Sequence, residues 1–139
     1  MITIKDQPPK LGDVTVLTSL GINLGSSTIS IVEIQQQDSK KQIVNTTKKS
    51  HLGDVRGCLL ELLKQQNDIA NKRICVTGRK LRHSLHLSAI SEPEAIELSV
   101  RHILPPDHPF RVVISAGGET FMLYHLNELG EIQNIQTGN

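Results

Sequence analysis

Two short segments combine glycine with small polar residues in a way that could hold a phosphate group. The first, GSST at 25–28, interrupts an apolar stretch, and the second, Gly117-Gly118, directly follows the apolar run RVVISA. Successive backbone N–H groups in such a turn can point at one anion, and glycine leaves that anion room to approach. The hydroxyl groups of serine and threonine add further donors. The candidate phosphate-binding residues are therefore Gly25, Ser26, Ser27, Thr28, Gly117 and Gly118.

An ordinary hairpin turn is the alternative explanation for each segment. A strand, a glycine turn and a second strand occur twice, at 16–34 and at 112–135. Two such turns on opposite walls of a cleft could bind a polyphosphate from both sides. The chain has no P-loop, because TGRK at 77–80 lacks the upstream glycine frame of that motif. The residues alone leave both explanations open.

The surrounding pattern is typical of an α/β protein. Three β-rich segments, Val14–Leu24, Thr28–Gln37 and Gln42–Ser50, are separated by short polar connections and predict an antiparallel meander. Residues 1–13 are mostly polar, contain two consecutive prolines and predict a flexible tail. The folded part is therefore expected over 14–139.

Two helices are predicted downstream of the meander. Asp54 can cap a helix over 54–70, in which apolar residues recur at helical spacing. A second helix over 91–104 begins with a capping box formed by Ser91 and Glu94. Because the box accounts for the acidic residues at the start of this helix, we expect no catalytic role for Glu92 or Glu94.

Short apolar runs predict the remaining strands. Arg73–Thr77 is expected to be a central parallel strand, and Arg111–Ala116 a second buried strand. Gly130 suits a four-residue loop in a hairpin between Phe121–Leu126 and Glu131–Ile135.

Composition and charge exclude several classes of protein. Fifteen basic and fourteen acidic residues leave a net charge of +1, and the basic clusters Lys48-Lys49 and Arg79-Lys80 are short, so no nucleic-acid partner is expected. No apolar run approaches the roughly 20 residues that a membrane span needs, and a cytoplasmic protein is expected. Cys58 and Cys75 show neither zinc nor disulfide spacing, and both are expected to be structural thiols.

Four segments in order resemble one known family. GINLGSSTISIVEI looks like the first phosphate motif of the actin-like ATPase superfamily, and ICVTGRK, ISEPEAIE and VISAGGETFMLYHLNELGEIQNIQTGN follow it. Together they resemble the BadF/BcrA-type ATPases, which activate 2-hydroxyacyl-CoA dehydratases. The resemblance covers residues 14–139, and the order of the motifs is more specific than any one of them.

The resemblance implies a fold and a cofactor set. Such activators are homodimers that hold one [4Fe-4S] cluster between subunits and use ATP hydrolysis to drive a low-potential electron from a donor into a partner CoA-ester dehydratase or reductase. Each protomer has two ribonuclease H-like halves around a nucleotide cleft. This chain resembles the first half and is expected to be truncated before the second, with a five-stranded mixed sheet in the order 3-2-1-4-5 and helices on both faces. The cluster cysteines of the family lie beyond this chain.

The departures from the family motifs concern the metal. Asn23 and Ser115 stand where the two phosphate motifs have their leading aspartates, and Glu119-Thr120 replaces Gln-Asp. Those carboxylates are natural holders of Mg²⁺, which prefers oxygen ligands. Asn23 can accept a bond from a metal-bound water, and Glu119 could supply a substitute carboxylate or be a solvated turn residue.

The sequence therefore favours the N-terminal nucleotide-binding half of a dehydratase-activating ATPase that binds ATP or ADP with Mg²⁺. The whole protein is expected to be an ATPase, and this chain alone is expected to be inactive. A small-molecule kinase of the same superfamily is one alternative. The other is a degenerate module that keeps the fold for interaction and does not hydrolyse ATP.

Overall fold

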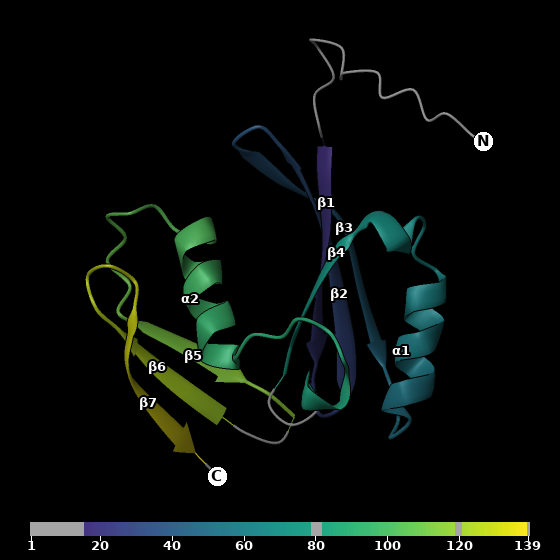
Figure 1. Ribbon diagram of the computed structural model, residues 1–139. Coiled ribbons are helices and arrows are strands. Elements are labelled where there is room, and N and C mark those ends of the chain that lie inside the picture. Colours follow the sequence, from purple (N-terminus) through teal and green to yellow (C-terminus); the bar gives the residue numbers. More distant parts are fainter. Residues whose placement is uncertain (1–15, 79–81, 119–120, 139) are drawn as a thin grey trace, which may run out of the picture.

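The computed structural model describes residues 16–78, 82–118 and 121–138. The strands of the described chain are β1 (Val16–Leu24), β2 (Thr28–Gln37), β3 (Lys40–Ser50), β4 (Arg73–Thr77), β5 (Val112–Ala116), β6 (Phe121–Leu126) and β7 (Ile132–Gly138). The helices are α1 (Val55–Lys64) and α2 (Glu92–Ile103), with short 3₁₀ turns at Ile69–Asn71 and Arg82–Ser84 (Figure 1). The predicted tail at 1–13 lies outside the described residues.

The first sheet contains the predicted meander. Its strand order is β3-β2-β1-β4, with β1 antiparallel to β2, β2 antiparallel to β3, and β4 parallel to β1. Leu24 lies opposite Ile29, so the turn between β1 and β2 is tight and consists of the GSST segment. The antiparallel meander is confirmed, and Arg73–Thr77 is confirmed as a parallel strand.

The hydrophobic core lies between the first sheet and α1. Alternate residues of β1 and β2 point to this face, and they pack against Cys58, Leu59 and Leu62 of the helix. Asp54 caps the helix as predicted, because its carboxylate accepts the backbone N–H of Gly57 at 2.8 Å. Cys58 is 7% exposed, which confirms its place in the core.

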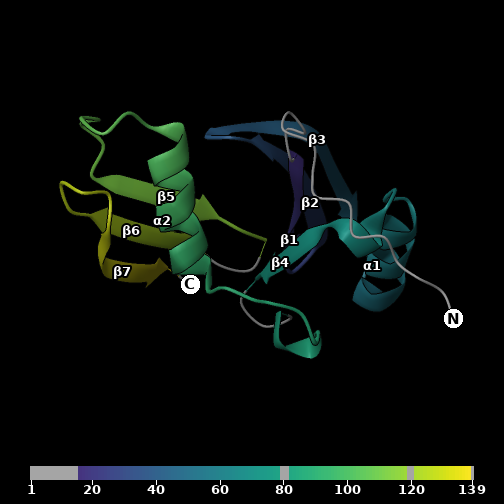
Figure 2. The same ribbon diagram turned by 45° about the horizontal axis from the view of Figure 1, so that its top comes forward.

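The second sheet has the order β5-β6-β7 and is covered on one face by α2 (Figures 1 and 2). The helix begins as predicted, with the Ser91 hydroxyl accepting the N–H of Glu94 at 3.3 Å. Met122, Tyr124 and Leu126 of β6 are buried. The loop between β6 and β7 contains Gly130 with φ of +74°, the left-handed conformation that favours glycine.

The prediction of a five-stranded sheet in the order 3-2-1-4-5 with helices on both faces is wrong. β5 pairs with β6 and not with β4, and each sheet has its own helix (Figure 2). The outer edge of β4 is partly occupied by the segment before α2: the Val76 N–H donates to the Ser88 carbonyl at 2.8 Å, and the Ile90 N–H to the Val76 carbonyl at 2.9 Å. A strand placed there would compete for these backbone groups.

Two finer strand predictions also need correction. β4 lies at the edge of its sheet instead of its centre. β5 is not buried, because Val112 is 42% exposed and Ile114 is 58% exposed. The second sheet has α2 on one face, and these two side chains belong to the other. In the described ranges, no helix is both long and apolar enough to cross a membrane.

Candidate functional site

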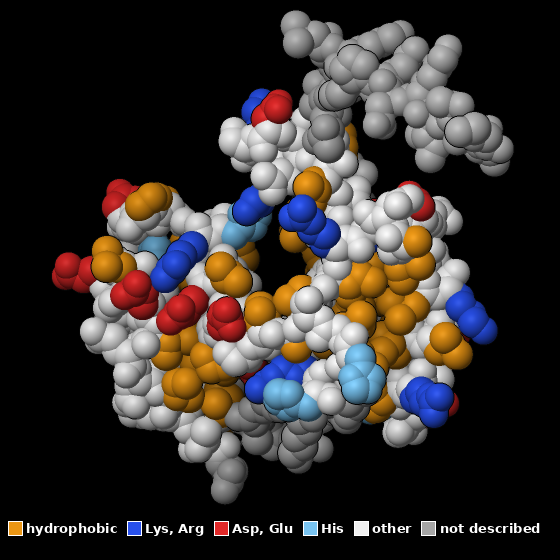
Figure 3. Space-filling view, in the orientation of Figure 1, with side chains coloured by type: hydrophobic (Ala, Val, Ile, Leu, Met, Phe, Trp, Pro, Cys, Tyr) orange, Lys and Arg blue, Asp and Glu red, His pale blue; other side chains and the backbone are white. Residues whose placement is uncertain are grey.

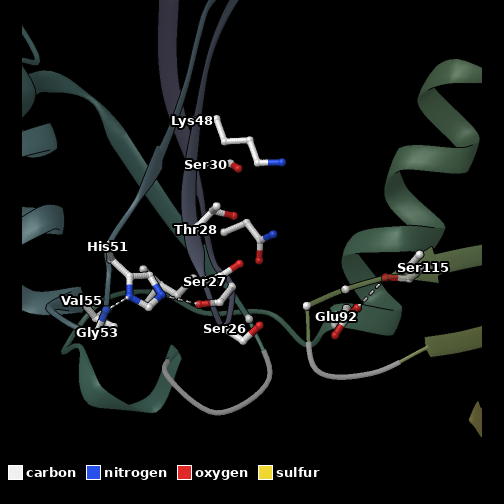
Figure 4. Close-up of a pocket in the computed structure, with 17 residues that line it drawn as sticks. Ser26, Ser27, Thr28, Ser30, Lys48, His51, Gly53, Val55, Glu92 and Ser115 are labelled. Atoms are coloured by element: carbon white, nitrogen blue, oxygen red, sulfur yellow. Dashed lines mark hydrogen bonds between the residues drawn. The ribbon is translucent and has the colours of Figure 1, made fainter. Parts of the chain in front are cut away.

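The two sheets enclose a pocket of about 640 Å³. Figure 3 shows the surface hollowed between the part that contains the first sheet and the part that contains the second. Its volume lies within the range of roughly 300–1,000 Å³ that is usual for ligand sites. The pocket is lined by segments 23–28 and 115–118, and further by Ser30, Lys48, His51, Gly53, Val55, Gly78 and Glu92 (Figure 4). All six candidate phosphate residues and Asn23 therefore meet in one place.

The first turn is closed by its own backbone. The N–H of Gly25 donates to the carbonyl of Thr28 at 3.0 Å, so Gly25 contributes room and a fixed bend instead of a free donor. A Cβ at position 25 would lie only 2.9 Å from the same carbonyl oxygen, which excludes a side chain without a backbone shift. The backbone N–H groups of Ser26 and Ser27 have no acceptor within the described part of the chain. These two N–H groups can therefore donate hydrogen bonds to a bound anion.

The second turn lies directly against the first. A Cβ at Gly118 would be 3.1 Å from the Ser26 Oγ and 3.3 Å from the Ser27 Oγ, tighter than most such contacts. Glycine at this position thus lets the second turn approach the two hydroxyl groups. Glu119, the predicted substitute carboxylate, lies outside the described residues.

His51 links the first turn to the segment before α1. Its backbone N–H donates to the Ser27 carbonyl at 3.1 Å, and its Nε2 lies 3.3 Å from the Gly25 carbonyl oxygen. The Nδ1 atom accepts the N–H of Gly53 at 3.1 Å. Because Nδ1 is an acceptor, the ring proton belongs on Nε2, which donates to Gly25. The residue as a whole is 7% exposed.

The opposite wall presents a carboxylate. The Ser115 hydroxyl lies 3.2 Å from the Glu92 Oε1, to which it can donate (Figure 4). The sequence predicted only a structural role for Glu92 at the start of α2. In the structure, Glu92 also lines the pocket. Among the described lining residues it is the only carboxylate.

The lining residues do not reproduce a magnesium site with two carboxylates. Asn23 and Ser115 are neutral, and no group of three or more potential ligands of the His, Cys, Asp or Glu type occurs among the described residues. The residues do not suit an iron–sulfur cluster either. Cys58 lies in the core, and neither Cys58 nor Cys75 lines the pocket.

Sequence reasoning missed several residues of the pocket and assigned another to a different role. Ser30, Lys48, His51 and Gly78 had no predicted function, and Glu92 was expected to serve the helix alone. A signal existed for Ser30, since a polar residue between Ile29 and Ile31 marks the face of the strand that points away from the core.

The fold is shared with several solved structures. The activator of 2-hydroxyisocaproyl-CoA dehydratase from Clostridium difficile, solved with bound ADPNP, matches with a TM-score of 0.69 and 21% identity, over 88% of this chain and 46% of that one. Component A of (R)-2-hydroxyglutaryl-CoA dehydratase from Acidaminococcus fermentans matches with a TM-score of 0.67 and 22% identity, over 88% and 47%. An exopolyphosphatase from Cytophaga hutchinsonii matches with a TM-score of 0.65 and 15% identity, over 87% and 50%.

The resemblance to dehydratase activators is thus confirmed at the level of the fold. The chain spans about half the length of these structural neighbours. Scans against protein-family models and against curated proteins give no match.

Proposed function

We propose that this chain is the N-terminal nucleotide-binding part of an ATP-dependent activator of a 2-hydroxyacyl-CoA dehydratase or a related CoA-ester enzyme. The observation that supports the proposal most directly is the contact between the two glycine turns, since Gly118 lies against the hydroxyl groups of Ser26 and Ser27 in one pocket. The shared fold supports it further, because one neighbour with this fold is an activator solved with bound ADPNP.

The chemistry proposed for the pocket is the binding of a phosphate chain. The free backbone N–H groups and hydroxyl groups of Ser26 and Ser27 would donate to phosphate oxygens from one side, and the turn at 117–118 would close the other. Proteins usually bind ATP together with Mg²⁺. The described lining residues, however, offer Mg²⁺ only one charged ligand, Glu92. We therefore assign no step to the metal.

The activity of the whole protein belongs to the same proposal. ATP hydrolysis would be coupled to the transfer of a low-potential electron, within a cytoplasmic homodimer that holds a [4Fe-4S] cluster and acts on a dehydratase component. The ligands of that cluster would lie outside this chain, in accordance with the core position of Cys58.

A degenerate module that binds partners without hydrolysing ATP is the second candidate. It is favoured by Asn23 and Ser115, which line the pocket but lack the charge that would hold a metal. If the module still binds phosphate, both candidates predict nucleotide binding, and they differ only in ATP hydrolysis.

The experiment that tests the proposal is an NMR titration of the chain with ATP, ADP and adenosine. We expect amide shifts in 23–28 and 115–118 with ATP and ADP, and none with adenosine, because the turns bind phosphate. Unshifted amides in both turns with a folded protein would contradict nucleotide binding and favour the interaction module.

A further inference from the structure

Three polar side chains form a row across the first sheet on the face that lines the pocket. In the strand register, Asn23 of β1 lies opposite Ser30 of β2, and Ser30 lies opposite Lys48 of β3. All three line the pocket, and Figure 4 shows Lys48 and Ser30 side by side on that wall, with the Lys48 side chain extending toward the second sheet. Thr77 of β4 continues the row beside Asn23, and its buried Oγ1 has no hydrogen-bond partner in the described structure.

Within the described residues, Lys48 lacks the kind of ion pair that Lys49 and Lys72 make, and so do Lys40 and Lys41 of the same strand. Lys49 points to the other face of the sheet and pairs with Glu61 of α1 at 2.5 Å, and this hydrogen bond raises the pKa of Lys49. Lys72 pairs with Glu33 at 2.8 Å. Within the described part of the chain, Lys48 makes neither a hydrogen bond nor an ion pair. Its charge is therefore available to a ligand.

The charges around the pocket make Lys48 the candidate counter-ion. It is the only lysine or arginine among the described lining residues. The ionisable groups that face it are His51 on the same side and Glu92 on the opposite wall, where the Ser115 hydroxyl already bonds to the carboxylate. With neutral residues at 23 and 115, Glu92 is the one carboxylate among the described lining residues that would oppose the charge of a phosphate chain.

We propose that Lys48 is the counter-charge for the phosphate chain of the bound nucleotide, in a row with Ser30 and Asn23, and that this site binds the nucleotide without Mg²⁺. The inference rests on the proposed nucleotide binding. A lysine ammonium group has three donors and acts as a point charge, which suits phosphate oxygens. Hydrogen bonds between such a group and phosphate are stronger than neutral ones. The alternative is a solvated lysine on an exposed strand, which would not affect binding.

Two matched variants separate these alternatives. Lys48→Met and Lys49→Met remove the same charge from adjacent residues, but only Lys48 faces the pocket. In EDTA we expect Lys48→Met to weaken ATP binding by about tenfold or more, the effect of losing one charge-assisted contact. Lys49→Met should stay within about twofold of the wild type, and Lys48→Arg should retain most of the affinity. Calorimetry and the amide shifts of residues 23–28 are the measurements.

The comparison of EDTA with Mg²⁺ tests the second half of the proposal. Wild-type affinity for ATP should be the same within about threefold in both, and inorganic triphosphate should compete. Equal affinities of Lys48→Met and Lys49→Met, with clear binding by the wild type, would overturn the role of Lys48 alone. Binding that requires Mg²⁺ would overturn the metal-free site. If the folded wild type binds no nucleotide in EDTA and none in Mg²⁺, the proposed function and this inference are both overturned.

Discussion

The imidazole of His51 bonds to the backbone of Gly25, a residue 26 positions earlier in the chain, across 3.3 Å from Nε2 to the carbonyl oxygen. The same residue holds the Ser27 carbonyl with its backbone N–H. Two carbonyl groups of the first glycine turn are therefore fixed from outside the turn. Holding these carbonyl groups restricts the orientation of the whole turn, including its free N–H groups.

Replacing His51 with alanine should loosen this turn. The variant loses the bonds to Gly25 and to Gly53, and we expect the free energy of unfolding to fall by about 1–3 kcal/mol. Amide hydrogen exchange at residues 25–28 should accelerate, and ATP affinity should fall several-fold. His86→Ala, at an exposed position, is the control. Unchanged exchange at the turn in His51→Ala would show that the histidine does not hold it.

Adding one methyl group at Gly118 should separate the two turns. Its Cβ would meet the Ser26 and Ser27 hydroxyls at 3.1 and 3.3 Å, so these groups must move by a few tenths of an ångström. We expect Gly118→Ala to weaken ATP binding while the unfolding free energy changes by less than about 1 kcal/mol. Gly138→Ala is the matched control, since its Cβ would meet Phe121 at an ordinary 3.6 Å. Equal affinities of the two variants would argue against phosphate binding between the turns.

Restoring carboxylates should make nucleotide binding depend on metal. In Asn23→Asp with Ser115→Asp, the new aspartate at 115 lies beside Glu92, which now accepts the Ser115 hydroxyl at 3.2 Å. Without metal, these carboxylates repel the triphosphate, so affinity in EDTA should fall; with Mg²⁺ bound between them it should exceed that of the wild type. Asn23→Asp with Ser115→Asn lacks the pair and is the control. A double aspartate variant that ignores Mg²⁺ would contradict this account.

The core against α1 gives a prediction that does not depend on any ligand. Leu62 is 1% exposed, whereas Leu60 on the same helix is 53% exposed. Leu62→Ala leaves a cavity between helix and sheet, and we expect the free energy of unfolding to fall by about 2–5 kcal/mol. Leu60→Ala should change it by less than about 1 kcal/mol. Urea denaturation followed by circular dichroism measures both. Similar losses in the two variants would contradict the helix orientation described above.

Elements with strong local signals were predictable from the sequence. The bounds of Thr28–Gln37 and Arg73–Thr77 agree with the structure, and Ser91 caps α2 as its spacing to Glu94 indicates. These features depend on residues within a few positions of one another. The turn at 25–28 was predictable for the same reason, because glycine and serine between two apolar runs are residues that tight turns favour.

The pairing of β5 could not be predicted in this way. A short apolar strand can pair with either edge of several other strands. The residues of β5, such as Ile114, do not indicate which strand it will join. In the structure, the segment 88–90 occupies part of the outer edge of β4, where β5 was expected to pair, through two backbone hydrogen bonds. That contact has no sequence signature.

The missed site residues share a similar cause. Lys48 reaches the pocket because β3 pairs with β2 in a register that places it beside Ser30. A bulge near Glu33 and Ile34 shifts that register farther along the same pair of strands, which composition does not reveal. His51 joins the site through the end of β3. Neither residue lies near the 25–28 or the 117–118 turn in the sequence.

β3 is the outermost strand of the first sheet, and an outermost strand invites a second molecule to add to the sheet. Exposed Ile43 and Val44 in its middle would strengthen such an association. Lysines at 40, 41, 48 and 49 flank this apolar pair on both sides, and two copies aligned along the strand would bring like charges together. The strand that extends Lys48 into the pocket is thereby also protected from intermolecular pairing and aggregation.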